Sequence, residues 1–147
     1  MKITSFAAAM AAIFLPAMAS AAGNPVTVLH PWFRYLLPQI PAGGFMTLHN
    51  ASDKPIVLDG VSSPACGMAM LHQSISSGGA DMMMMVKTIT VPANGDFAFS
   101  PDGYHVMCMQ PRMKVGGTVP VRLLFQNAPP LTVTFPVYGA GGPKAEP

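Results

Sequence analysis

The chain has 147 residues, of which half are hydrophobic and only 10% are charged. Its eight basic residues nearly balance six acidic ones, and the basic residues form no cluster. Because a basic patch is the electrostatic footprint of a nucleic-acid binder, a nucleic-acid partner is not expected. Binding to a membrane surface lacks support for the same reason.

The first 22 residues have the features of a secretory signal peptide. Lys2 is followed by an apolar run and then by small residues that include A-x-A cleavage sites. The run contains Pro16 and is short for a bilayer, so a cleaved signal is favoured over stable membrane insertion. We therefore expect an exported protein with one folded domain over residues 23–138 and a disordered tail over residues 139–147.

The rest of the sequence alternates turn signals with short apolar stretches. The turn signals are PAGG, NASDKP, SSGGAD, PANGD, PDG and QNAPP, and no segment keeps a helical period beyond about two turns. Many short strands at this spacing predict an all-β sandwich or barrel. The expected strands are Val26–Arg34, Phe45–Asn50, Ile56–Val61, Met68–Gln73, Met82–Val91, Phe97–Phe99, Tyr104–Met109, Val119–Phe125 and Leu131–Val137.

The sequence offers little that points to an enzyme. Asp53, Asp96 and Asp102 lie in turn contexts, where such residues usually bond to their own backbone. His105 and Cys108 are three residues apart, which places them on opposite faces of a strand and disfavours a Cys–His nucleophile pair. Motifs such as G-x-S-x-G, H-E-x-x-H and the P-loop are not found in the sequence. We expect no catalysed reaction.

Clusters of methionine and histidine support metal binding better. Most of the thirteen methionines fall in three short segments, MAMLHQ, DMMMM and YHVMCM. Alternate residues of a strand share a face, which groups Met68, Met70 and His72 in the first segment and His105, Met107 and Met109 in the last. Thioether sulfur is a soft ligand that selects Cu(I) over the hard cations. These clusters predict a Cu(I) site, assembled at one end of the sandwich.

Two other interpretations of the methionines remain open. A methionine in a strand is often core filler, because its flexible thioether fits irregular gaps. Alternatively, the protein is an exported β-sandwich adaptor whose methionines form an adaptable binding surface.

The spacing of four of these residues resembles the signature of the PCu(A)C-type periplasmic copper chaperones. That signature is a His, ten residues, a Met, twenty-one residues and then His-x-Met, which here fits His72, Met83, His105 and Met107. The flanking segments HPWFR, GFMTLHN, SSPACGMAMLH, ITVPANG and PDGYHVMCM are also similar to the family. The resemblance covers residues 26–137.

The resemblance implies a cupredoxin-like, Greek-key β-sandwich in the periplasm that binds one Cu(I) through these four side chains. Met85 shares a strand face with Met83 and is the possible stand-in, whereas Met82 and Met84 are expected to pack or shield. The family delivers copper, by ligand exchange, to the copper-bearing subunit of cytochrome c oxidase alongside Sco-type thiol proteins. The alternative is a copper-buffering protein without a dedicated oxidase partner, and in either case we expect a monomer.

The two cysteines, Cys66 and Cys108, could form a disulfide, remain free thiols or bind copper. An even count in an oxidising compartment favours the disulfide, and each cysteine lies close to a strand that carries expected ligands. A blue-copper site is disfavoured because no histidine follows Cys108. His30 and His49 are expected to be structural or surface residues.

Overall fold

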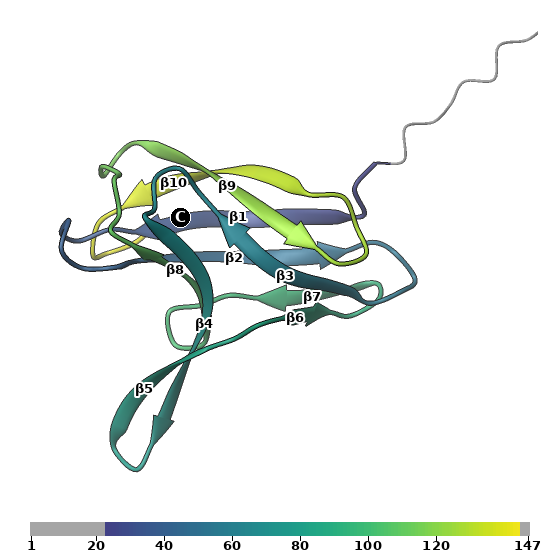
Figure 1. Ribbon diagram of the computed structural model, residues 1–147, viewed down its shortest axis with the longest axis horizontal. Helices are drawn as coiled ribbons and strands as arrows, with labels where there is room; N and C mark the ends of the chain where they lie inside the picture. Colours follow the sequence, from purple (N-terminus) through teal and green to yellow (C-terminus); the bar gives the residue numbers. More distant parts are fainter. Residues whose placement is uncertain (1–22, 145–147) are drawn as a thin grey trace, which may run out of the picture.

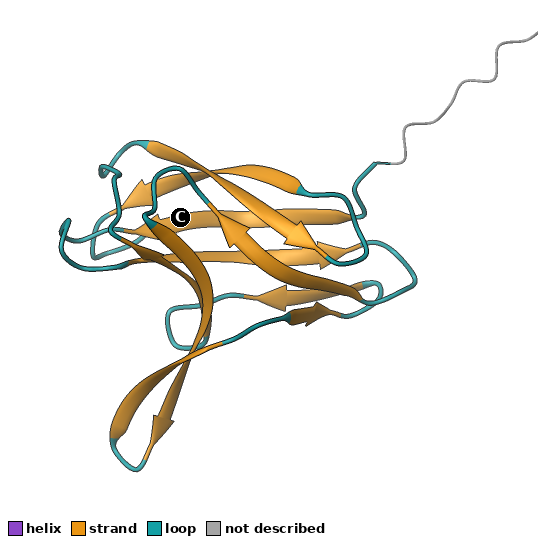
Figure 2. Ribbon diagram, in the orientation of Figure 1, coloured by secondary structure: helices purple, strands orange, loops and turns teal. Residues whose placement is uncertain are grey.

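The structure, a computed structural model, describes residues 23–144, and in that range it consists of strands and loops without a helix (Figure 2). Accordingly, none of the described residues forms a helix that could cross a bilayer. The predicted signal peptide lies outside the described residues. The strands are β1 (Val26–Arg34), β2 (Ala42–Asn50), β3 (Ile56–Ser62), β4 (Met68–Ser77), β5 (Ala80–Met85), β6 (Ile89–Val91), β7 (Gly95–Ala98), β8 (Tyr104–Met109), β9 (Thr118–Phe125) and β10 (Leu131–Tyr138).

The expected all-β class is confirmed, with one strand assignment corrected. The sequence predicts a single strand over Met82–Val91, but the structure has two, β5 and β6. They separate because β5 pairs with β4, whereas β6 pairs with β3 in the other half of the sheet. The chain crosses between the halves at Val86–Thr88, where the sequence has no glycine or proline to mark a break in the strand. Elsewhere the predicted strands differ from the observed ones by a few residues at their ends.

The strands form one mixed sheet in the order β5-β4-β8-β2-β1-β10-β9-β3-β6, with β7 also paired to β2. All of its pairings are antiparallel except β1 with β10, which joins the two halves. The sheet folds on itself, so that β9 and β3 lie across the strands of the first half (Figure 1). The β4–β5 hairpin extends away from this body (Figure 1), and its loop contains Gly78 and Gly79, both with positive φ.

The core lies between the two halves and follows the strand period of two. In β9, Val119, Val121 and Leu123 are buried and the residues between them are exposed. Phe33 of β1 and Phe135 of β10 are fully buried, with ring centroids 5.3 Å apart. One buried cluster therefore holds residues of both halves together.

Gly44 in β2 allows close packing between β2, β8 and the core. A Cβ built there would lie 2.7 Å from the Phe33 ring and 3.0 Å from Cβ of Val106. Val106 belongs to β8 and is the register partner of Gly44. The small residue thus lets β2 and β8 pack tightly against the core aromatic residue.

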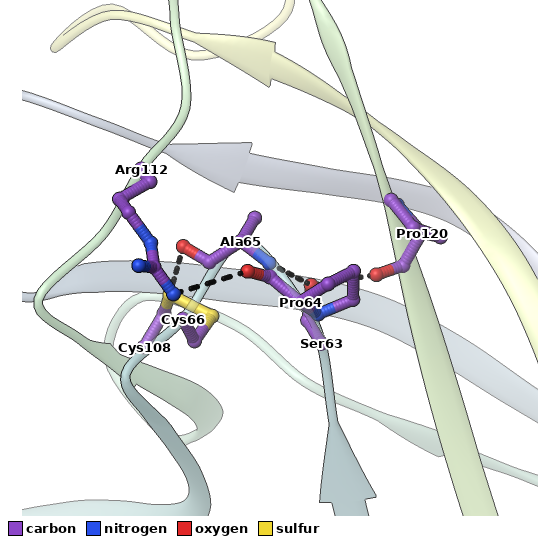
Figure 3. Close-up of a disulfide and its surroundings, with 7 residues drawn as sticks. All are labelled: Ser63, Pro64, Ala65, Cys66, Cys108, Arg112 and Pro120. Atoms are coloured by element: carbon purple, nitrogen blue, oxygen red, sulfur yellow. Dashed lines mark hydrogen bonds between the residues drawn. A yellow bond between two sulfur atoms is a disulfide. The ribbon is translucent and has the colours of Figure 1, made fainter.

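A disulfide joins Cys66, in the loop before β4, to Cys108 in β8, with the two Cα atoms 5.3 Å apart (Figure 3). The loop around it is held by further hydrogen bonds (Figure 3). The backbone N–H of Arg112 donates to the carbonyl of Ala65 at 2.7 Å, and the Ser63 hydroxyl donates to the carbonyl of Pro120 at 2.6 Å. The disulfide therefore fastens the start of β4 to the end of β8.

Replacing both cysteines with serine is expected to destabilise the fold. The cross-link spans a sequence separation of 42, and loop entropy at that length corresponds to about 4 kcal/mol. We expect the free energy of unfolding of the C66S/C108S variant, measured in urea, to fall by about 2 to 4 kcal/mol. An unchanged unfolding midpoint with an unchanged m-value would contradict the stabilising role.

Candidate metal centre

The strands β8, β4 and β5 lie side by side and present the methionine and histidine clusters on a common face. In the β4–β8 register His72 lies opposite His105 and Met70 opposite Met107. Directly paired residues of neighbouring strands project from the same face. The intervening residues, such as Leu71 and Val106, are buried in the core, so the clusters occupy the other face of this sheet edge.

The two imidazole rings form a close cross-strand pair. The ring centroids of His72 and His105 are 5.9 Å apart in an edge-on arrangement. Nδ1 of His105 donates to the backbone carbonyl of Gly103 at 3.1 Å, because a carbonyl oxygen can only accept. This bond fixes the tautomer of the neutral ring and leaves Nε2 of His105 with a free lone pair.

Each ring of the pair has one buried nitrogen without a hydrogen-bond partner, Nε2 of His105 and Nδ1 of His72. A buried polar atom left without a partner costs about 1 to 3 kcal/mol. Burial, and secondarily the nearby His105, lowers the pKa of His72, which favours its neutral form. Two imidazoles that each have a buried nitrogen without a partner are suited to a metal ion, since ligation would satisfy both nitrogens.

A pocket of about 200 Å³ lies beside the histidine pair. His105 and Met107 contribute to its wall and are buried, with 4% and 8% of their surfaces exposed. Met83 and Ser74 line it from the hairpin, and the remaining lining residues are Arg34, Leu36, Ile40, Pro41, Gly43, Phe45 and Pro101. The lining includes no carboxylate, so the pocket lacks the charged oxygen ligands that usually hold hard cations.

Aromatic and cationic groups form one side of this pocket, and the sequence did not identify them as part of it. The Phe45 ring lies 4.7 Å from Trp32 and 6.5 Å from His105, measured between ring centroids. The Arg34 guanidinium stacks 5.5 Å from the centre of the same ring. A Cβ on Gly43 would approach the ring to 3.0 Å, so this glycine gives Phe45 room to lie beside the pocket.

The four methionines of the hairpin differ in position. Met83 is paired with Ser74 and lines the pocket. Met85 is directly opposite His72 in the register but lines a different pocket, next to Lys87. All of β5 is exposed, and its even-numbered methionines alternate to the other face. Met82 and Met84 are therefore exposed side chains that do not face the histidine pair.

The structure thus brings three of the four expected ligands, Met83, His105 and Met107, to one pocket, with His72 beside His105. The other two histidines lie elsewhere. Nδ1 of His49 is 2.6 Å from an Asp96 carboxylate oxygen, and His30 is an exposed residue with φ of 50° in the irregular part of β1.

Solved structures of copper-binding domains resemble this fold. The copper-bound PCuAC domain from PmoF2 superposes with a TM-score of 0.66 at 24% identity, covering 78% of this chain and 93% of that domain. The solution structure of apo-DR1885 from Deinococcus radiodurans is 35% identical, with a TM-score of 0.61 and coverage of 95% and 97%. Its Cu(I)-bound form is 36% identical, with a TM-score of 0.64 and coverage of 83% and 85%. The resemblance to PCuAC domains is confirmed.

A family model described as "Putative lipoprotein LpqE-like" matches residues 26–137, and the chain belongs to this LpqE-like family. The "Putative lipoprotein Lxx21020" of Leifsonia xyli subsp. xyli (strain CTCB07) is 26% identical over 137 residues. The alignment covers 89% of this chain and 82% of that relative. The matched region contains the whole β4–β5–β8 face.

Proposed function

We propose that the protein is a periplasmic chaperone that binds one Cu(I) through His72, Met83, His105 and Met107. The observation that carries the proposal is the cross-strand histidine pair, whose two buried nitrogens have no partner. The thioethers of Met83 and Met107 line the adjoining pocket. The Cu(I) form of DR1885, which is 36% identical, adds support because a related chain binds this ion.

The chemistry of the four side chains favours Cu(I) over other metals. Thioether sulfur is a soft ligand and carries no proton, so only the two imidazoles compete with protons for the metal. Zinc sites usually recruit thiolates or carboxylates. Both cysteines are held in the disulfide, and the pocket lining contains no carboxylate, which leaves a site suited to a soft monovalent ion.

The unequal exposure of the ligands is suited to transfer by ligand exchange. His105 and Met107 are buried, whereas 61% of the Met83 surface is exposed on the protruding hairpin. An acceptor can therefore displace Met83 first and reach the buried ligands afterwards. Such a transfer exchanges the protein's coordinate bonds to Cu(I) for those of the acceptor and changes no covalent bond, so we propose a carrier rather than an enzyme.

Two features support export of the protein. The descriptions of the family and of its Leifsonia relative as lipoproteins support export, and a structural disulfide is stable in an oxidising compartment. As acceptor we propose the copper-bearing subunit of cytochrome c oxidase, with a Sco-type thiol protein acting on the same centre. A copper buffer is the competing function and would share the site but lack this acceptor.

Cu(I) binding to single-residue variants tests three of the four ligands. We expect one-to-one binding in the wild type, loss of that binding in His105→Ala and Met107→Ala, and about tenfold weaker binding in Met83→Ala, equivalent to about 1.4 kcal/mol. Titration against a chromogenic Cu(I) chelator measures the affinities. The reductant should contain no thiol, because thiols released from the disulfide would themselves bind Cu(I).

Met82→Ala and Met84→Ala are the matched controls, since they remove the same side chain from the other face of the same strand. We expect their affinities to stay within about twofold of the wild type. Unchanged binding in His105→Ala and Met107→Ala would overturn the site. Equal losses for Met82, Met83 and Met84 would show an undifferentiated sulfur surface.

The acceptor is tested separately by a transfer experiment. Cu(I)-loaded protein is mixed with the isolated copper domain of the oxidase, and the copper content of each is measured after chromatographic separation. We expect transfer from the wild type to proceed faster than from a control mixture in which a Cu(I)–chelator complex supplies the same amount of copper. Retention of all copper by the loaded protein, with the site intact, would favour the buffering function.

A further inference from the structure

Three successive cross-strand pairs occupy the face of β4 and β8 that carries His72 and His105. His72 is paired with His105, Met70 with Met107, and Met68 with Met109. Residues two apart on a strand are separated by about 7 Å. The first pair supplies the proposed imidazole ligands, and the last pair lies about 14 Å farther along the strands, at the end nearest the disulfide loop.

The far end of this face has its own pocket, which the proposed copper site does not use. Its lining consists of Gly67, Met68, Met70, Met109 and Gln110. Three of these five residues are methionines, and none is charged or a histidine. None of these five residues lines the pocket beside the histidine pair, so the two pockets are separate.

Core packing does not explain these methionines. Met68 has 60% of its surface exposed and Met109 has 37%. By contrast, residues of the same strands that alternate with the methionines, such as Leu71 in β4 and Cys108 in β8, point into the core. A methionine that fills a gap in a core is enclosed by other side chains. Here the three methionines line a hollow at the surface, where an ion can reach their thioethers.

We infer that Met68, Met70 and Met109 form a second Cu(I) site. Three thioethers provide a soft, uncharged ligand set that selects Cu(I) and discriminates against Zn²⁺, Mg²⁺ and Ca²⁺. The Met70–Met107 pair connects this site to the histidine pair, since it lies between the other two pairs in the register. The second site thus adjoins the first along a continuous row of soft ligands, although its three ligands are distinct from the proposed four.

The test counts bound ions with Ag(I), which shares the soft, monovalent character of Cu(I) and needs no reductant. Native mass spectrometry of the full mature chain is expected to show two tightly bound Ag(I) ions. The Met68→Leu/Met109→Leu variant is expected to retain one, because leucine preserves apolar volume but removes the sulfur. Both substituted residues are exposed, so the fold should be preserved, which circular dichroism checks.

Two further variants separate this site from its neighbours. Met85→Leu removes an exposed thioether of the hairpin and should leave two ions bound. His72→Ala/His105→Ala should lose the first ion but keep the one at the methionine pocket. Two ions retained by Met68→Leu/Met109→Leu would overturn the second site, as would loss of the second ion in Met85→Leu.

The outcomes also separate this inference from the proposed function. A wild type that binds one ion, lost only in the histidine variant, would remove the second site and leave the copper chaperone proposal intact. A wild type that binds two ions, both retained in the histidine variant, would instead contradict the ligands of the first site.

Discussion

The site depends on the register of one antiparallel strand pair. Because His72 and His105 are direct partners in β4 and β8, their imidazoles lie on one face with two unused nitrogens. A shift of one residue would turn one of these side chains toward the core. The disulfide, which links the start of β4 to the end of β8, opposes such a shift. The same register aligns the methionines beside the histidines.

The body of the sandwich supplies the fixed part of the site, and the hairpin supplies the accessible part. Gly44 allows β2 to lie close against β8, and Gly43 leaves room for the Phe45 ring beside the pocket. Met83, in contrast, is exposed on a strand at the edge of the sheet. The combination of buried His105 and Met107 with exposed Met83 suits the proposed carrier, which must hold its ion in solution and release it to a partner.

Much of the strand pattern, but not its connectivity, follows from the sequence. β1 and β8 have the predicted bounds because alternation and turn signals mark their ends clearly. The division of Met82–Val91 escaped detection because it results from tertiary pairing with two different strands. Of the four ligands expected from the family resemblance, Met83, His105 and Met107 line the pocket and His72 lies beside His105. Arg34 and Phe45 reach the pocket from strands distant in sequence, and no local pattern marks them.

The central claim is that the two partnerless nitrogens are the copper donors, and long-range ¹H–¹⁵N correlation spectra of the histidine rings test it directly. At about pH 8, where free imidazole is neutral, Nε2 of His105 and Nδ1 of His72 should resonate as unprotonated nitrogens. One equivalent of Cu(I) should shift both of them together and leave the other nitrogen of each ring protonated. Binding of that equivalent with neither resonance moved would contradict the account.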